Sequence, residues 1–448
     1  MSAIASVLLE QGYCVSGSDL RPSPPMERLA QRGAVLHVGH AAANLGDAQA
    51  VIMSSAVPAD NPELVEARRR GIPVFKRGEW LGRMLHGKRA VAVAGTHGKT
   101  TTTAMIALLA RDAGLQPTFV LGGELRQLGG NAAAGAGDLF VIEADEYDRT
   151  FLGLSPHIAV VTVVEWDHPD CYPSPEAMLD AFRQFVMALP PDGCLVGCGD
   201  EPGVRELIAY QQARSSARAI TYGLQAGNDW QAVEVRTNRR GGHDFGVARA
   251  GQTVEEVAPM ISLRVPGLHN IKNSLAALIV ADRLGIAPDR AAATLADFEG
   301  VDRRFEVKGE AGGVLVIDDY AHHPTEIRAT LAAARVRYLG RPIWAVFQPH
   351  TYSRTRALLD GFAGAFGDAE HVILVDIFAA REQQDGSVSS RDILARMAHP
   401  DARYIAALPE AASYLVAHLS PGAVLMTLGA GDGYQVGEMV LDGLRNRQ

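Results

Sequence analysis

Short, continuous apolar runs alternate along the chain with longer segments of helical periodicity, and most of these runs end in polar or acidic residues. Continuous apolar runs of this length predict strands that are buried on both faces, as in parallel sheets. The clearest runs are Arg89–Ala94, Leu139–Glu143, Ile158–Val164, Val314–Asp319, Ile343–Phe347 and Val424–Leu428. The alternation of strand and helix predicts an α/β fold whose domains are each built on a mainly parallel sheet.

The length of 448 residues exceeds what one compact core holds, and the pattern predicts three domains. We expect a Rossmann-like domain over residues 1–88, a P-loop ATPase-like domain over 89–300 and a second Rossmann-like domain over 301–448. A Rossmann-like domain begins with a strand and a glycine-rich turn, whereas this chain begins with a predicted helix over residues 2–11. We therefore expect the first strand and its glycine-rich loop to be missing.

Composition narrows the class of protein. The net charge is −9, from 42 basic and 51 acidic residues, and no basic block interrupts the chain, which argues against a nucleic-acid partner. No apolar run reaches the roughly 20 residues that a membrane-spanning helix needs. Four cysteines are present, and the Cys194/Cys198 pair has no second pair or nearby histidine to complete a zinc site. We expect a reduced, cytoplasmic enzyme with no membrane partner.

A glycine-rich loop lies between the predicted strand 89–94 and an apolar helix over 104–110. Glycines let backbone N–H groups approach phosphate oxygens, and a helix N-terminus favours anions. In this context Lys99 would reach the terminal phosphates and Thr100 would ligate Mg²⁺. The eight-residue P-loop pattern is incomplete, because Val93 stands where its first glycine should be, so an ordinary strand-to-helix turn is the alternative. The candidate phosphate-binding residues are Gly95, Thr96, His97, Gly98, Lys99, Thr100 and Thr101.

Acidic clusters follow two further predicted strands. Glu143 ends the first strand, and His168 belongs to the cluster that follows the second. Because the carboxyl ends of parallel strands meet at one edge of a sheet, these side chains are placed to hold Mg²⁺ beside the glycine loop. Solvated acidic turns are the alternative interpretation.

Other polar residues are candidates for contacts with substrates. Asp19, Ser54 and Ser55 follow predicted strands of the first domain, where open α/β sheets bind ligands, and capping of the strand ends is the alternative. Asn270 and Asn273 lie one turn apart at a helix start, where they would read a base edge or line the helix.

The third domain carries polar clusters after four predicted strands, which is hard to explain by packing alone. We expect these strand ends to line a crevice of a doubly wound sheet. The main candidates there are Tyr320, His322, His323, Arg354, Arg381 and Asp432.

These motifs resemble the Mur ligase family, the ATP-dependent amide-forming enzymes of peptidoglycan synthesis, over essentially the whole chain. The shared strings are Gly-Thr-His-Gly-Lys-Thr-Thr at 95–101, Glu-Ala-Asp-Glu at 143–146, Asp-His at 167–168, His-Asn-x-x-Asn at 269–273 and Arg-Arg-Phe at 303–305. The resemblance implies ATP and Mg²⁺ as cofactors. It implies that Lys99 and Thr100 hold phosphates and metal, that Glu143 and His168 bind Mg²⁺, and that Arg304 reaches the γ-phosphate.

The strings 318–326 and 347–355 further imply the first amino-acid addition of peptidoglycan precursor synthesis. In that reaction L-alanine is joined to the carboxylate of UDP-N-acetylmuramate through an acyl phosphate, and His322 or His323 would deprotonate the amine. Lys99, Arg304, His322 and Arg354 would then be the catalytic residues. The other implied contacts are adenine with Asn270 and Asn273, the UDP-sugar with Asp19, Ser54 and Ser55, and the muramate carboxylate and amino acid with Tyr320, His322 and Arg354.

Two alternatives stay open at this point: a related ligase that recycles tripeptide, and a catalytically idle nucleotide-binding homologue. The chain departs from the family at Val163, where an asparagine is common. No lysine occurs between Lys99 and Lys272, which excludes a carbamylated lysine from that segment.

Overall fold

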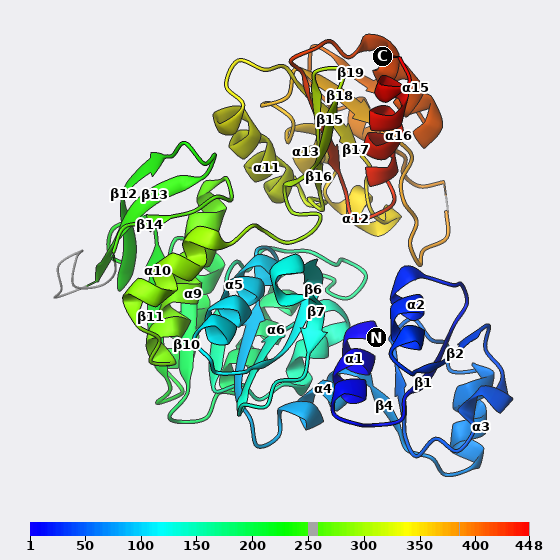
Figure 1. Cartoon of the computed structure of the whole chain (residues 1–448), viewed down its shortest axis with the longest axis vertical. Coiled ribbons are helices and arrows are strands. Elements are labelled where there is room, and N and C mark those ends of the chain that lie inside the picture. Colours follow the sequence, from blue (N-terminus) through cyan, green and yellow to red (C-terminus); the bar gives the residue numbers. More distant parts are fainter. Residues whose placement is uncertain (250–258, 385, 448) are drawn as a thin grey trace. The chain divides into compact units, whose positions relative to one another are not determined.

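The computed structural model describes residues 1–249, 259–384 and 386–447 (Figure 1). The chain divides into two compact units. The first unit comprises Met1–Glu165, Leu179–Gln231 and Leu275–Thr294. The second comprises Trp166–Met178, Ala232–Ser274 and Leu295–Gln448. The α/β class is confirmed, with mainly parallel sheets. The predicted boundaries of the three domains stay a prediction.

The first 88 residues alternate helix and strand, as predicted, but their strands form two separate parallel pairs, β1 with β2 and β3 with β4. The elements are α1 (Ser2–Glu10), β1 (Ser16–Asp19), α2 (Pro24–Gln31), β2 (Val35–Val38), the 3-10 helix η1 (Ala42–Leu45), β3 (Val51–Met53), α3 (Pro62–Arg69), β4 (Val74–Lys76) and α4 (Arg77–Leu85). Helix α1 buries one apolar stripe, which includes Ile4 and Val7.

A larger sheet follows. Its elements in the first unit are β5 (Arg89–Ala94), α5 (Lys99–Asp112), β6 (Thr118–Leu125), η2 (Arg126–Leu128), β7 (Gly130–Ala133), β8 (Leu139–Glu143), η3 (Tyr147–Gly153), β9 (Ile158–Val161), β10 (Cys194–Cys198), α7 (Pro202–Gln212) and β11 (Arg218–Gly223). The strand order is β11-β10-β9-β5-β8-β6-β7, and β5 pairs in parallel with both β8 and β9. This pairing places the loops that follow the three strands at one edge of the sheet.

Four elements contain a boundary between the units: α6 (Pro175–Met187), β12 (Trp230–Thr237), α9 (Leu268–Arg283) and α10 (Pro288–Asp297). Strand β12 continues the large sheet beside β11. Within the second unit, β13 (His243–Arg249) and β14 (Ile261–Ser262) pair antiparallel.

A six-stranded sheet forms the centre of the second unit, in the order β15-β16-β20-β17-β18-β19. Only its edge pair β15–β16 is antiparallel, and the other four pairings are parallel, as predicted for a doubly wound domain. The strands are β15 (Glu306–Ala311), β16 (Val314–Asp319), β17 (Ile343–Phe347), β18 (His371–Leu374), β19 (Ala402–Tyr404) and β20 (Val424–Leu428). The helices are α11 (Pro324–Arg337), α12 (Tyr352–Ala357), α13 (Leu359–Ala363), α14 (Ser390–Leu394), α15 (Leu408–His418) and α16 (Tyr434–Arg445).

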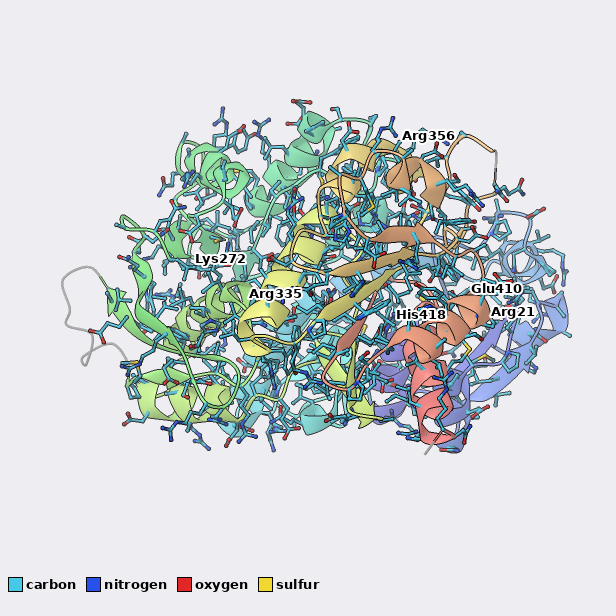
Figure 2. All side chains as sticks on the ribbon, turned by 90° about the horizontal axis from the view of Figure 1, so that it is seen from above. Arg21, Lys272, Arg335, Arg356, Glu410 and His418 are labelled. Carbon is cyan, nitrogen blue, oxygen red and sulfur yellow. The ribbon has the colours of Figure 1, made fainter. Side chains whose placement is uncertain are left out.

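Successive residues of the central strands point to opposite faces of this sheet and build two cores. Ile317 and Phe347 pack with residues of α11, α13 and α14 on one face, whereas Val316 packs with α15 and α16 on the other. Helix α15 buries one side against this second core and carries the exposed Glu410 and His418, which Figure 2 labels. Across the described residues, no helix combines the length and apolar character needed to cross a membrane.

Candidate functional site

The glycine loop joins β5 to α5 and is tied to the segment after β9. Gly95 and Gly98 have φ values of +132° and +80°, which favour glycine, and Gly98 is the N-cap of α5. The Thr96 N–H donates to the carbonyl of Val163 at 2.8 Å, and the Glu165 N–H donates to the Thr96 hydroxyl at 2.8 Å. The helix begins at Lys99 rather than at residue 104, so its first N–H groups point into the loop, as a phosphate cradle requires.

Lys99 lies inside this loop with its ammonium group held by oxygen atoms. It donates to the carbonyl of Gly95 at 2.6 Å and to a carboxylate oxygen of Glu146 at 2.8 Å. Burial alone would lower the pKa of Lys99, but the carboxylates of Glu146 and Asp145 outweigh burial and raise that pKa above its ordinary value. The ammonium is therefore charged, and its contact with phosphate stays a prediction.

Thr100 and Glu143 are adjacent, as the predicted metal site requires. The Glu143 carboxylate accepts a hydrogen bond from Thr100 and another from the Gly122 N–H at 2.8 Å. Burial raises the pKa of Glu143, although Lys99 opposes that rise. A hydroxyl and a carboxylate beside the glycine loop are the hard oxygen ligands that Mg²⁺ prefers, so the residues present fit that ion.

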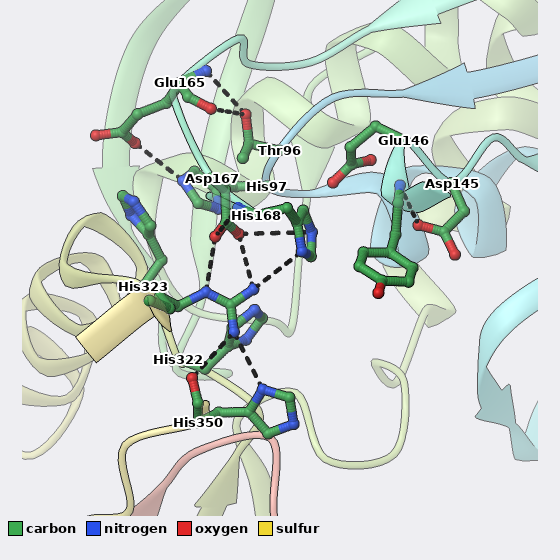
Figure 3. Close-up of polar contacts among 12 residues, drawn as sticks. Thr96, His97, Asp145, Glu146, Glu165, Asp167, His168, His322, His323 and His350 are labelled. Atoms are coloured by element: carbon green, nitrogen blue, oxygen red, sulfur yellow. Dashed lines mark hydrogen bonds and ion pairs between the residues drawn. The ribbon is translucent and has the colours of Figure 1, made fainter. Parts of the chain in front are cut away.

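The predicted loop residue His97 also has a carboxylate partner in the first unit. Its Nε2 lies 2.9 Å from a carboxylate oxygen of Glu165, and Thr96 bonds to the Glu165 backbone (Figure 3). The segment after β9 is thereby fastened to the glycine loop.

The second unit contains a buried hydrogen-bond network centred on the guanidinium of Arg354. Asp167 accepts two hydrogen bonds from the guanidinium of Arg354, from Nε at 2.7 Å and from Nη2 at 3.2 Å. The same guanidinium reaches Nδ1 of His168 at 3.4 Å and Nδ1 of His350 at 3.1 Å. Figure 3 shows Asp167 and His168 next to His322 and His350.

Charge in this network is concentrated in one ion pair. Burial would raise the pKa of Asp167, but Arg354 and His168 hold it well below its usual range. Asp167 in turn offsets the burial of Arg354 and raises the pKa of that guanidinium. Asp167 is 2% exposed and Arg354 is 3% exposed, so the pair is sealed from water.

Three histidines of the second unit, His269, His322 and His350, are neutral and are called the neutral histidines below. Burial is the main cause in each, and it lowers the pKa of His322 to about 3 and the pKa of His269 and His350 to about 4. A group with a pKa near 3 is a weak base for an amine, because the pKa of an ammonium group is several units higher. The proposed basic role of His322 stays a prediction.

His323, the other predicted base, has a structural role. It is 2% exposed and is the N-cap of α11, where its Nδ1 accepts the Thr325 N–H at 3.3 Å. Tyr320 contacts His322 edge-to-face, with ring centroids 5.3 Å apart.

Arg304 lies close to Tyr320 and Glu326. Its guanidinium is 5.0 Å from the ring centroid of Tyr320 and 3.6 Å from the Glu326 carboxylate. The preceding Arg303 has a φ of +61° and donates to Asp318 at 3.0 Å. Arg303 therefore anchors the backbone from which Arg304 projects.

The paired asparagines share one helix face, as predicted. Asn273 donates to the side-chain oxygen of Asn270 at 3.1 Å, and Asn270 donates to the carbonyl of Pro266 at 2.7 Å. Both are buried, so they line the helix start, and adenine recognition stays a prediction.

The sugar-site candidates of the first domain make local contacts. Asp19 accepts the Arg21 N–H at 3.3 Å, Ser54 accepts the Ala56 N–H at 3.2 Å, and Ser55 is exposed. These bonds are those of strand-end caps, and the role in UDP-sugar binding stays a prediction.

Two of the other predicted crevice residues also have carboxylate or amide partners. Arg381 donates to Asp170 at 2.7 Å, and Asp432 accepts from Gln348 at 2.7 Å. The strand-end clusters after β17 and β20 therefore meet, as the doubly wound topology predicts.

Sequence reasoning did not single out the partners of the predicted residues. Glu146 stood in a quoted motif, but nothing marked it as the counter-ion of Lys99. Gly122 carried no signal at all, although its N–H holds Glu143. These partners are distant in the sequence from Lys99 and Glu143, so only the fold identifies them.

Comparisons with known proteins cover nearly the whole chain. The family model described as Mur ligase family, catalytic domain, matches residues 1–89, Mur ligase middle domain matches 93–281, and Mur ligase, glutamate ligase domain, matches 303–431.

Among curated relatives, the UDP-N-acetylmuramate--L-alanine ligase of Roseiflexus castenholzii is 46% identical, over 98% of this chain and 94% of that protein. The protein of that name from Frankia casuarinae is 45% identical, over 99% of this chain and 95% of the relative.

Solved structures of related ligases are similar to this chain over its whole length. The UDP-N-acetylmuramate-alanine ligase of Thermotoga maritima has a TM-score of 0.82 at 29% identity, with 100% of this chain and 97% of that chain covered. A murein peptide ligase of Psychrobacter arcticus has a TM-score of 0.75 at 25% identity, with 100% and 96% covered.

Proposed function

Because the chain belongs to the Mur ligase family, we propose that it is an ATP-dependent ligase that joins L-alanine to the carboxylate of UDP-N-acetylmuramate. The observation that carries this proposal is the charged Lys99 in a phosphate cradle, beside Glu143 and Glu146, in a chain whose relatives bear that ligase's name. The murein peptide ligase is the closely related alternative activity, and no described contact favours it.

The chemistry requires activation of a poor acyl donor. Transfer of the ATP γ-phosphoryl group to the muramate carboxylate makes an acyl phosphate, which the neutral amine of L-alanine attacks with release of phosphate. Lys99 and the N–H groups at the start of α5 would hold the phosphates, and Arg304 would stabilise charge on the transferred group. Asn270 and Asn273 would face the adenine, and Asp19, Ser54 and Ser55 would lie along the UDP-sugar.

Thr100 and Glu143 would hold Mg²⁺, with His168 as a further ligand. The ion would supply charge neutralisation on the phosphate oxygens. Glu143 stays beside Thr100 because the Gly122 N–H fixes its carboxylate.

Tyr320, His322 and Arg354 would orient the muramate carboxylate and the amino acid. His322 is neutral because burial holds its pKa at about 3, so it offers a lone pair without adding a charge near Arg354. The cytoplasm, where ATP and nucleotide sugars are available, is the proposed location.

The test is phosphate release from Mg-ATP in the presence of UDP-N-acetylmuramate, with and without L-alanine. We expect release only when both substrates are present, and we expect the tripeptide L-alanyl-γ-D-glutamyl-meso-diaminopimelate to fail as the amine. Release with the tripeptide and not with L-alanine would favour the alternative activity, and no release with either would contradict the proposal.

Two lysine variants sharpen the test. Lys99→Ala removes the ammonium from the phosphate cradle and should abolish release. Lys308→Ala removes a lysine whose contact is a partly exposed ion pair with Glu306 at 3.3 Å, and should leave release unchanged. Equal rates for the two variants would contradict the assigned role of Lys99.

A further inference from the structure

The guanidinium of Arg354 has no donor to spare for a ligand in this arrangement. Its Nε and Nη2 hold Asp167, Nη2 also faces His168, and Nη1 faces both the ring and the carbonyl of His350 at 3.1 and 3.4 Å. A guanidinium offers five N–H groups, and all of its nitrogen atoms are engaged. The side chain is only 4% exposed. The carboxylate-orienting role of Arg354 therefore requires one of these partners to leave.

Asp167 is the partner whose chemistry matches an incoming ligand. Its carboxylate takes two of the guanidinium donors side by side, which is an arrangement that carboxylates frequently adopt on arginine. The imidazole and carbonyl of His350 are neutral acceptors, and replacing them with a carboxylate would place a second negative charge beside Asp167. Replacing Asp167 conserves both the charge and the geometry at Arg354.

We propose that Asp167 is an internal stand-in for the carboxylate of the amino-acid substrate, which displaces it from Arg354 on binding. This inference rests on the proposed function, because it takes Arg354 as the group that receives the amino acid. Asp167 is then a positioning residue that competes with substrate and holds the arginine ready between turnovers. No covalent bond is made or broken in the exchange, and one carboxylate replaces another.

Displacement of Asp167 would also affect the backbone around it, because Asp167 contacts His168 and Met178. The His168 N–H donates to Oδ1 of Asp167 at 2.6 Å, and the Asp167 N–H contacts Sδ of Met178 at 3.4 Å. His168 has a φ of +53°, a conformation that is uncommon for non-glycine residues. When Asp167 leaves Arg354, the constraint on this turn is reduced and the proposed metal ligand His168 can rearrange.

Competition of this kind lowers the apparent affinity for the amino acid. A ligand that must displace an internal partner binds in proportion to the fraction of protein in which that partner has left. The Asp167→Asn variant keeps the shape of the side chain but removes its charge, so Arg354 loses its bidentate carboxylate and binds an external one more readily.

The first experiment measures KM for L-alanine in phosphate release by Asp167→Asn. We expect KM to fall by roughly tenfold, the scale of one charge-assisted hydrogen bond, whatever happens to kcat. The matched control is Asp170→Asn, which removes the ion pair of Asp170 with Arg381 at 2.7 Å from the same segment and should leave KM unchanged. A KM that stays the same or rises in Asp167→Asn overturns the exchange, because a purely structural role predicts a rise.

A second measurement needs no variant and holds if Asp167→Asn fails to fold. Hydrogen exchange of the segment 166–178 is followed in the unmodified protein with Mg-ADP and UDP-N-acetylmuramate, in the presence of L-alanine or of L-alaninol, which lacks the carboxylate. We expect faster exchange of the His168 amide with L-alanine only. Equal exchange with both ligands overturns the proposal.

The two proposals fail in different ways. An unmodified protein that releases no phosphate with any amino acid contradicts the proposed function. An active protein in which Asp167→Asn leaves KM unchanged, or in which L-alanine and L-alaninol give the same exchange, contradicts only the carboxylate exchange.

Discussion

Gly122 is the residue that we expect to control the position of the Glu143 carboxylate. A Cβ atom added at Gly122 would lie 2.4 Å from Oε1 and 2.6 Å from Oε2 of Glu143, far inside ordinary contact, which begins at 3.4 Å. The backbone of Gly122 has no positive φ, so alanine is tolerated there in conformation. The strain in Gly122→Ala therefore falls on the end of the Glu143 side chain, which must retreat by about 1 Å.

A retreat of this size changes activity more than stability. The clash falls on the end of a flexible side chain rather than on backbone, so we expect a loss of unfolding free energy of about 1 kcal/mol or less. A displacement of about 1 Å in a group that positions reactants costs up to about a hundredfold in rate. We expect kcat to fall by about tenfold to a hundredfold and the Mg²⁺ concentration for half-maximal activity to rise.

The assay is phosphate release over a titration of Mg²⁺, together with thermal unfolding. Gly367→Ala is the matched control, because a Cβ at Gly367 meets nothing within 4 Å. The reasoning would be refuted by a Gly122→Ala protein that keeps both its rate and its Mg²⁺ dependence. Equal losses in both alanine variants would also refute it, since the clash at Glu143 would then have no specific effect.

Three further predictions concern ionisable side chains. Lys99→Ala leaves the Glu146 carboxylate buried without the Lys99 ammonium and should lower the unfolding free energy by about 3 kcal/mol, and adding Glu146→Gln should recover part of this loss in denaturant titrations. Lowering the pH from 7 to 5 should destabilise the protein by up to about 2 kcal/mol for each neutral histidine, because the unfolded chain binds protons below pH 6.5 and the folded groups do not until about pH 4 or lower. This stability is fully present above pH 6.5, and a His269→Gln protein that loses as much stability as the parent would count against that assignment. Arg303→Lys loses the guanidinium contacts with Asp318 and with the rings of Tyr320 and Tyr434, so Tm and kcat should both fall, and an unchanged kcat would argue against an anchoring role for Arg303.

Much of the fold could be predicted because its signals are local. The bounds of β5, β8, β16, β17 and β20 agree with the apolar runs, since a strand that is buried on both faces must be apolar throughout. The predicted strand Ile158–Val164 ends earlier, at Val161, because the carbonyl of Val163 turns to accept the Thr96 N–H. Strand β6 was not predicted, because Gly122 and its glycine neighbour interrupt the apolar run. A larger residue at Gly122 would collide with the Glu143 carboxylate.

The sequence by itself determined the α/β class, the glycine loop between β5 and α5 and the identity of the candidate groups, because strand periodicity and short motifs depend on neighbouring residues alone. Only the tertiary structure decided which charges meet. Asp167 and Arg354 are 187 positions apart, and Lys99 and Glu146 are 47 apart. Pairings over such separations depend on strand order and register, which no local pattern encodes, and the depressed pKa of His322 likewise follows from burial by distant elements.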